Sequence, residues 1–321
     1  MTAAIRVFRT DRGDAKERLD LVLVRHMADL PEVSRNQIQG WIDGGLVRIN
    51  GAVAGKPSVR LALGDEVEVP LPPPPPPKPA MLAQEMPVSV LFEDEHLLAV
   101  DKPPGLVVHP ASGHSQGTLI NALLWRARDW GEDRRPSLVN RLDRGTSGVL
   151  LAAKTPAVHA ALARTLRRRE TEKEYLAVAY GEVLAEKGRI DLKILRDPVD
   201  FKRRITSKKE GRDSLTLWER LAGGHGLALL RCRLLTGRTH QIRVHLESQG
   251  WPIVGDAMYG GPRWKGLEDP VLAAACRDFP RQALHAWRLA FVHPATGEPM
   301  EIVAPVPEDI ERLLAAAGLR A

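Results

Sequence analysis

The sequence predicts an α+β protein of two domains, and three features of the chain support this prediction. A proline-rich run, LPPPPPPKPAML, separates two segments that each have the composition of a folded domain. The first segment shows helical periodicity followed by short strands. In the second, strands and helices do not alternate as in βαβ units. We therefore expect a small domain at residues 17–70, a linker at 71–84, and a larger domain at 85–316. The larger domain should be built on a mixed, mostly antiparallel β-sheet with flanking helices.

The first segment predicts two helices and a small sheet. The helices are expected at residues 19–27 and 35–43, and Ser34 and Gln37 have the spacing of a capping box for the second helix. The glycine pair that follows ends that helix. An Asn-Gly turn at 50–51 predicts a hairpin, and LGDEVEVP alternates like a half-exposed strand.

The proline run itself favours an extended polyproline II conformation. At ~3.1 Å per residue it would make a semi-rigid spacer of roughly 20 Å. A PxxP ligand for a partner is the alternative, but the position between two folded segments favours a spacer.

The second segment predicts strands, helices and loops in an irregular order. Strands are expected in VSVLFEDEHLLAVDKP, on both sides of the loop in SLVNRLDRGTSGVLLAAK, and in KEYLAVAYGEV. Helices are expected in TLINALLWRA and PAVHAALARTLRRRE. GLALLRCRLLTGRTHQIRVHLESQG predicts a strand, a loop, and a helix that begins near Thr239 and ends at Gly250.

Charge and cysteine content favour a nucleic-acid partner and a reducing compartment. The chain has 46 Lys and Arg against 40 Asp and Glu, a net charge of +6, which suits a polyanion. Its two cysteines, Cys232 and Cys276, form no CxxC pattern, which argues against disulfides and a cysteine zinc site. The beginning of the sequence lacks a signal-peptide pattern, and no apolar run could span a bilayer. We expect a soluble, cytoplasmic protein without a membrane partner.

Several kinds of chemistry have no motif in this chain. There is no GxxxxGK[ST] loop and no GxGxxG after a strand, so we expect no nucleotide cofactor. His240 and His245 are five residues apart and HExxH is absent, so we expect no metal. Ser147 lies in GTSGV rather than in a GxSxG elbow, so serine-hydrolase chemistry is unsupported.

Four stretches remain that could carry chemistry. In LVNRLDRGTSGVLLAA a lone carboxylate, Asp143, lies between Arg141 and Arg144. Taken alone, this stretch also fits a surface ion pair in a hairpin. The other three stretches are VDKPPGLVVHP with Lys102 and His109, TEKEYLAVAYG with Tyr175, and LLTGRTHQIRVHL with Arg238, His240 and Arg243.

In this order, behind residues 17–70, the four stretches resemble the RluA-type RNA pseudouridine synthases. Residues 17–70 resemble the S4 RNA-binding domain in their helix, glycine turn, VRINGAV and GDEVEV. PIVGDAMYGG and RQALHAWRLAFVHPATGEPMEIVAPVPED are most similar to the branch that acts on large-subunit ribosomal RNA. The resemblance covers roughly residues 17–315. It departs at Asn140, where the family usually has histidine.

The resemblance implies that uridine is isomerised to pseudouridine without a cofactor. The bond from N1 to C1′ breaks, the base turns, and C5 takes the place of N1. Asp143 is assigned as the carboxylate that attacks or stabilises charge, and nearby guanidinium groups would keep it ionised. Arg141 is expected to replace the flipped base, and Arg243 to be the buried counter-ion of Asp143. Tyr175 is expected to lie against the uracil, although its position on an alternating strand, taken alone, favours a core residue.

The resemblance also implies an RNA-contacting set. Lys102 and His109 are expected in the cleft wall, although His109 fits a structural histidine equally well, and Arg238 is expected at a backbone phosphate. The basic segment at residues 201–212 has little apolar content, which favours a loop that becomes ordered on RNA. The expected partner is large-subunit ribosomal RNA, and the expected state is a monomer. The full set is Arg35, Arg48, Lys102, His109, Arg144, Arg203, Arg204, Arg238 and His240.

Two other functions stay open at this point. A non-catalytic S4-type RNA-binding or ribosome-assembly factor could keep such a fold, and Asn140 is the feature that favours it. An RNA N-glycosylase would need a second carboxylate about 5–9 Å from the first. No such partner acid is evident in the four stretches.

Overall fold

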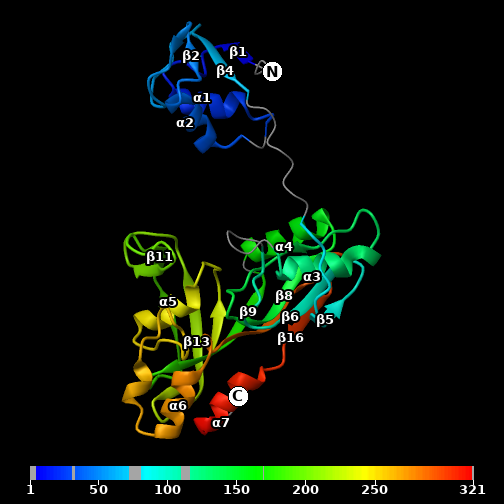
Figure 1. Cartoon of the computed structure of the whole chain (residues 1–321), viewed down its shortest axis with the longest axis vertical. Coiled ribbons are helices and arrows are strands. Elements are labelled where there is room, and N and C mark those ends of the chain that lie inside the picture. The colour runs from blue at the N-terminus through cyan, green and yellow to red at the C-terminus, as the bar shows by residue number, and fades with distance from the viewer. Residues whose placement is uncertain (1–4, 31–32, 72–80, 110–115, 169, 320–321) are drawn as a thin grey trace. The chain divides into compact units, whose positions relative to one another are not determined.

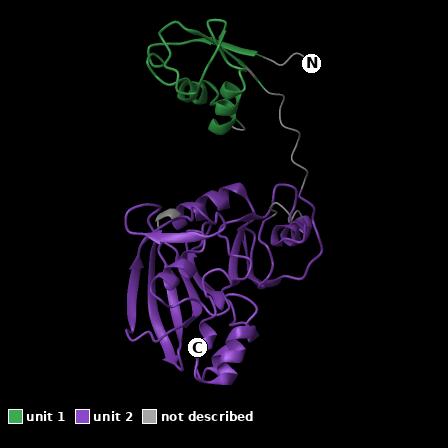
Figure 2. Cartoon of the chain, turned by 60° about the vertical axis from the view of Figure 1, so that its left-hand side comes forward, with its two compact units in different colours: residues 1–80 green, residues 81–321 purple. Residues whose placement is uncertain are grey.

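The computed structural model describes residues 5–30, 33–71, 81–109, 116–168 and 170–319. The chain forms two compact units, Met1–Ala80 and Met81–Ala321, coloured green and purple in Figure 2. Most of the expected linker, residues 72–80, lies outside the described residues. The last four residues of that expected linker belong to the second unit, where Asn121 Nδ2 donates to the carbonyl of Leu82 at 2.7 Å.

The first unit joins two helices and a small antiparallel sheet in one apolar core. Helices α1 (Leu19–His26) and α2 (Arg35–Asp43) form where the sequence predicts them, and the Ser34–Gln37 capping box is present. Leu19 and Leu23 of α1 pack in the same cluster as Ile38 and Ile42 of α2. The strands are β1 (Ile5–Arg9), β4 (Glu66–Pro70), β2 (Arg48–Ile49) and β3 (Ala52–Val53), in the order β1-β4-β2-β3.

Strand β1 lies upstream of residue 17, where the sequence placed the start of the domain. It pairs antiparallel with β4 and extends the sheet. In this strand the apolar residues Ile5 and Val7 point to solvent, with 58% and 54% of their surface exposed, whereas Phe8 packs against the core. The usual period-two signal is therefore missing from the sequence.

Within its described residues, the second unit is built on one ten-stranded sheet (Figure 1). The main path is β10-β13-β14-β9-β15-β8-β6-β5, with β16 beside β15 and β7 beside β8. All pairings are antiparallel except that of β8 with β15, so the predicted class is confirmed. The strands are β5 (Ser89–Glu93), β6 (Leu97–Lys102), β7 (Ser137–Leu138), β8 (Ser147–Ala153), β9 (Glu172–Tyr180), β10 (Lys187–Asp191), β13 (Leu215–Gly224), β14 (Leu227–Leu234), β15 (Leu284–Val292) and β16 (Pro299–Val303).

Both faces of the sheet are covered at its centre. All seven residues of β8 are buried, and they alternate between two apolar clusters: Leu150 packs in one, Val149 and Leu151 in the other. Such a continuous apolar run is what a strand covered on both faces requires. The helices of this unit are α3 (Leu119–Arg126), α4 (Pro156–Arg168), α5 (Gln241–Ser248), α6 (Pro270–Asp278) and α7 (Glu308–Ala316).

The parallel contact between β8 and β15 depends on a glycine. Gly148 pairs with Ala286 and has a φ of +109°, and a Cβ there would overlap the carbonyl of Ala286. Glycine alone tolerates both the conformation and the close approach. Because β8 starts four residues after Asp143, this contact fixes the loop that carries Asp143 beside the start of β15.

Two segments differ from the predicted elements. Helix α5 begins at Gln241 rather than near Thr239, because His240 adopts a left-handed φ of 59° at the helix start. The segment expected to be a loop at 201–212 contains β12 (Arg204–Ser207), which pairs antiparallel with β11 (Lys193–Arg196). Among the described residues, no helix has the length and apolar content to cross a bilayer.

Candidate active site

A cavity of about 940 Å³ lies in the second unit where the four stretches singled out in the sequence meet. Its wall is formed by residues 107–109 after β6, the loop between β7 and β8, strand β9, and the segment from the end of β14 into α5. The predicted site residues that line it are His109, Arg141, Asp143, Arg144, Tyr175, Arg238, His240 and Arg243.

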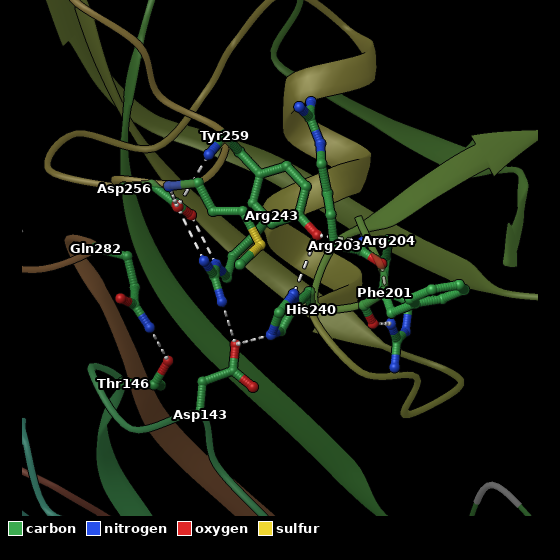
Figure 3. A network of polar contacts seen from close by, with 11 residues as sticks. Asp143, Thr146, Phe201, Arg203, Arg204, His240, Arg243, Asp256, Tyr259 and Gln282 are labelled. Carbon is green, nitrogen blue, oxygen red and sulfur yellow. Dashed lines mark hydrogen bonds and ion pairs between the residues drawn. The ribbon is translucent and has the colours of Figure 1, made fainter. Parts of the chain in front are cut away.

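The loop that carries Asp143 is fastened by hydrogen bonds around it. The backbone N–H of Thr146 donates to the carbonyl of Asp143 at 3.0 Å. Arg281 Nη1 donates to the carbonyl of Gly145 at 3.1 Å. Gln282 Nε2 donates to Thr146 Oγ1 at 3.1 Å, a bond that Figure 3 shows. These bonds fix the loop while the Asp143 side chain lines the cavity.

Lys102 also fastens this loop, through the carbonyl of Arg144. Its Nζ donates to the carbonyls of Pro103 at 2.8 Å, Leu106 at 3.1 Å and Arg144 at 3.1 Å. Burial, with the charge of Arg281 nearby, lowers the pKa of Lys102 to about 8. The residue is 0% exposed and its three donors are occupied. Lys102 is therefore not part of the cavity wall, where the sequence placed it, and its ammonium group braces the loop.

Asp143 takes its counter-ion from α5 and not from its neighbours in sequence. Arg243 Nη1 donates to Asp143 Oδ2 at 2.9 Å, and His240 Nε2 lies 3.9 Å from the same oxygen. Among the described residues, no ion pair joins Asp143 to Arg141 or Arg144. The Asp143 side chain is 27% exposed, against 9% for Arg243. A buried cation thus holds one oxygen of a carboxylate that solvent and substrate can reach.

Arg243 is held by a second carboxylate that the sequence did not reveal. Its Nε and Nη2 donate to Asp256 at 2.6 Å and 2.9 Å. Burial opposes the charge of Arg243, but the bonds to Asp256 and Asp143 outweigh it and raise the pKa of the guanidinium. Asp256 belongs to PIVGDAMYGG, a stretch that the family resemblance includes but that carries none of the predicted site residues. An acid in an otherwise apolar and glycine-rich run is the signal that could have found it.

Tyr175 is both a core residue and a residue of the cavity wall, the two alternatives that the sequence left open. It lies on β9, belongs to the main apolar cluster, and is 8% exposed. Its ring also lines the cavity. Burial raises the pKa of the Tyr175 hydroxyl, and the negative charge of Asp143 adds to the shift. The phenol therefore stays protonated at any physiological pH.

His240 and Tyr259 form a second support beside Asp143 (Figure 3). Tyr259 Oη accepts the backbone N–H of Arg204 at 2.8 Å and lies 3.0 Å from His240 Nδ1. Because Oη accepts from Arg204, its own proton can be donated to Nδ1. That arrangement leaves the imidazole proton of neutral His240 on Nε2, the atom nearest Asp143. Burial lowers the pKa of His240, which favours this neutral form.

The other predicted RNA-contacting residues lie in three places. His109 is exposed at the cavity wall, where partial loss of solvent around its ring and the charge of Arg141 lower its pKa. Arg238 lines the cavity and donates from Nε to the carbonyl of Asp213 at 3.1 Å. Arg203 and Arg204 lie on or next to β12 and do not line the cavity.

Arg35 and Arg48 lie in the first unit, and each already has a partner. Arg35 Nη2 donates to Asp20 at 2.8 Å, and Asp20 has no exposed side-chain surface. Arg48 Nη1 donates to the carbonyl of Gly51 at 2.9 Å and remains exposed. Both guanidinium groups keep further donors available for phosphate.

Within the part of the chain that the structure describes, no three His, Cys, Asp or Glu side chains lie close enough together to hold a metal ion. Among the described residues, the cavity wall offers one carboxylate, its buried guanidinium partner, a phenol and several cations.

Comparisons with known proteins identify the family. A family model described as RNA pseudouridylate synthase matches residues 96–248, and one described as S4 domain matches residues 17–67. Ribosomal large subunit pseudouridine synthase D of Xanthomonas campestris pv. campestris is 42% identical over 304 residues, which cover 94% of this chain and 89% of that protein. The protein of the same name from Pseudomonas aeruginosa is 38% identical over 299 residues, covering 93% and 91%.

A solved structure agrees with these relatives. Human RNA pseudouridylate synthase domain containing 1 is 27% identical, with a TM-score of 0.55, over 72% of this chain and 87% of that one. Together, the matched regions and the sequence identities establish the family of this chain. The chain belongs to the RNA pseudouridine synthases that carry an N-terminal S4 domain, and it is an isomerase that acts on RNA.

Proposed function

We propose that this enzyme converts uridines of large-subunit ribosomal RNA to pseudouridine, with Asp143 as nucleophile and the target base flipped into the cavity. The observation that carries the proposal is the position of Asp143, which lines the cavity and is bonded to a buried guanidinium. The choice of RNA is supported by the relatives from Xanthomonas campestris and Pseudomonas aeruginosa, which are named for the large ribosomal subunit. A monomeric, cytoplasmic enzyme remains a prediction from the sequence.

The reaction needs little more than a positioned carboxylate. The N1–C1′ bond breaks and a C5–C1′ bond forms, C5 loses a proton and N1 gains one, so atoms and electrons balance without an oxidant or cofactor. Asp143 Oδ2 is anchored by Arg243, and no hydrogen bond to Oδ1 occurs among the described residues. One oxygen is thus free to attack the sugar or the base, while the anchored oxygen keeps the carboxylate aligned.

The cavity can accommodate an extruded nucleotide. Its volume of about 940 Å³ is within the usual range of ligand pockets, and flipping a base costs a few kcal/mol that the protein must offset. In the proposed complex the ring of Tyr175 lies against the uracil, and exposed Arg141 takes the place of the base in the stack. The phosphate backbone of the RNA would be contacted by three residues at the cavity wall, Arg144, Arg238 and His109.

Hydrolytic N-glycosylase chemistry is disfavoured because the second carboxylate, Asp256, is buried and already hydrogen-bonded. Asp256, which lies outside the four stretches, contacts Arg243 from the side that does not face Asp143. It is 3% exposed, and both its oxygens accept hydrogen bonds from Arg243. An acid so occupied cannot activate water or protonate a leaving group.

Mapping of pseudouridine in large-subunit RNA tests the proposal. Cells would carry the wild type, a deletion, or the deletion complemented with Asp143→Asn, which keeps the shape of the side chain. We expect the same marks to disappear in the deletion and in the Asn strain, with the variant protein present at wild-type levels. Purified enzyme and transcribed RNA should reproduce this difference, with a rate loss of at least about 10³-fold for Asp143→Asn.

Other results would lead to different conclusions. Marks that survive in the Asp143→Asn strain but not in the deletion would show that another residue is the nucleophile. A deletion that removes no mark from ribosomal RNA would show that the substrate is another RNA or that the chain acts by binding. Release of free uracil would favour the glycosylase.

A further inference from the structure

Asp256 lies just outside the cavity, in a turn that holds its carboxylate firmly. It is 3% exposed and is not part of the cavity wall. Its Oδ1 accepts the backbone N–H groups of Met258 at 3.0 Å and Tyr259 at 3.2 Å. The preceding Gly255 has a φ of +71°, and a Cβ there would overlap the carbonyl of Arg281. The carboxylate is thus fixed from two sides before it meets any partner.

This carboxylate binds Arg243 through two parallel hydrogen bonds. Nε donates to Oδ2 at 2.6 Å and Nη2 donates to Oδ1 at 2.9 Å, which leaves Nη1 for Asp143 at 2.9 Å (Figure 3). A guanidinium held at two points by a fixed carboxylate has one orientation in its plane. The direction of the remaining N–H, and hence the position of the anchored oxygen of Asp143, follows from Asp256.

The contact also changes the charge that Asp143 meets. One guanidinium is shared by two carboxylates, so the single positive charge of Arg243 is not devoted to Asp143 alone. Tyr259, three residues after Asp256, places its ring 5.0 Å from the guanidinium carbon and its hydroxyl 3.0 Å from His240. The same short turn therefore supports both groups that face Asp143 from α5 and its start.

We propose that Asp256 is a positioning residue for the isomerisation: it aligns Arg243, and through Arg243 it aligns Asp143, without touching the RNA. The inference rests on the proposed role of Asp143. The rival role for Asp256 is purely structural, as the anchor of the turn at 255–260. Asn at this position keeps an oxygen for Met258 and Tyr259 and removes the charge, so it separates the two roles.

The test is a double-mutant cycle on the full-length chain. Single-turnover rates at saturating enzyme and dissociation constants would be measured with a transcribed large-subunit RNA fragment for the wild type, Asp256→Asn, Arg243→Gln and the double variant. We expect Asp256→Asn to lower the rate by about 10- to 100-fold, since small misplacements of reacting groups have effects of that size. The dissociation constant should change less than about threefold. In the Arg243→Gln background, Asp256→Asn should cause no further loss, because the two residues act as one unit.

Glu301→Gln is the matched control. It removes one carboxylate from Arg288, which donates to Glu301 at 2.8 Å and 2.6 Å and does not line the cavity. Its rate should equal that of the wild type. Thermal unfolding of each variant shows whether the fold is kept. If Asp256→Asn does not fold, Asp256→Glu takes its place, since it keeps the buried charge and displaces it by one methylene. A lowered rate with unchanged binding then supports the proposal.

The inference is overturned if Asp256→Asn, or Asp256→Glu where that variant replaces it, keeps the wild-type rate. It is equally overturned if the loss appears only in RNA affinity, or multiplies with that of Arg243→Gln. Failure of the proposed function is separate: it appears as activity retained by Asp143→Asn, whatever the cycle between Asp256 and Arg243 gives.

Discussion

The side chain of Asn140 makes two hydrogen bonds to the main chain of β8. Its Oδ1 accepts the N–H of Leu151 at 2.8 Å and its Nδ2 donates to the carbonyl of Val149 at 3.3 Å. Strand β7 pairs with β8 up to Leu138 and then ends, so the amide continues the ladder where the backbone departs toward Asp143. Asn140 thus supplies one donor and one acceptor, and no titrating group is needed at this position. These hydrogen bonds to the main chain explain Asn140 better than the decay of an active site does.

Replacement of Asn140 tests this role directly. Asn140→Leu should lower the free energy of unfolding by about 1–3 kcal/mol, because it removes both partners of buried backbone groups. Asn140→His offers a donor and an acceptor again, so it should keep most of the stability and the pH–rate profile of the wild type. Urea unfolding and single-turnover rates from pH 6 to 9 provide the measurements. A stable Asn140→Leu variant with a large rate loss would instead place the amide in the chemistry.

At the scale of elements, the sequence was informative where local patterns decide the structure. The Ser34–Gln37 capping box and the apolar run of β8 depend on residues adjacent in the chain, and both are present. The hairpin of β11 and β12 was missed because its strands are four residues long and rich in charge, and its fold depends on Ile194 packing against Val244 and Tyr259. Such tertiary contacts leave no periodic signal.

In the active site, too, the features set by local sequence could be predicted and those set by tertiary packing could not. The four stretches could be selected from residue types and order, and the pairing of Arg243 with Asp143 could be expected from the resemblance. The contact of Asp256 with Arg243, and the burial of Lys102 among carbonyls, are decided by how loops pack in three dimensions. A lysine or an aspartate in a loop has the same sequence signature whether it faces RNA or braces the backbone.

The basic residues at the β11–β12 hairpin lead to a prediction about RNA binding. Arg203 donates to Glu247 at 3.4 Å, so reversal of its charge would add repulsion inside the protein, and neutralisation is the cleaner change. The pair Arg203→Gln and Arg204→Gln should weaken RNA binding and reduce the slope of log K against log salt by about 1–2. Arg312→Gln on α7, 67% exposed and bonded only to Glu308 among the described residues, is the control and should leave the slope unchanged. Equal slopes for all variants would place the hairpin away from phosphate.

At the scale of the whole molecule, buried histidines make stability depend on pH. His245 on α5 lies between the hydroxyls of Ser214 and Thr216, at 3.1 Å and 2.9 Å. His285 on β15 lies 2.9 Å from Ser147 Oγ. Both are 0% exposed, and burial lowers the pKa of each from 6.5 to about 4. Both are therefore neutral in the folded second unit at pH values where they would be protonated in the unfolded chain.

Acid should therefore destabilise the second unit over a defined range. Between pH 6.5 and 4 the unfolded chain binds protons that the folded unit excludes, so stability falls as the pH is lowered, by on the order of 3 kcal/mol for each histidine. Urea unfolding followed by tryptophan fluorescence, at steps between pH 7 and 4, would measure this slope. His285→Asn should flatten it, whereas His225→Asn, in an exposed turn with a φ of 54°, should not. A slope that His285→Asn leaves intact would mean that His285 does not contribute to the acid limit of the fold.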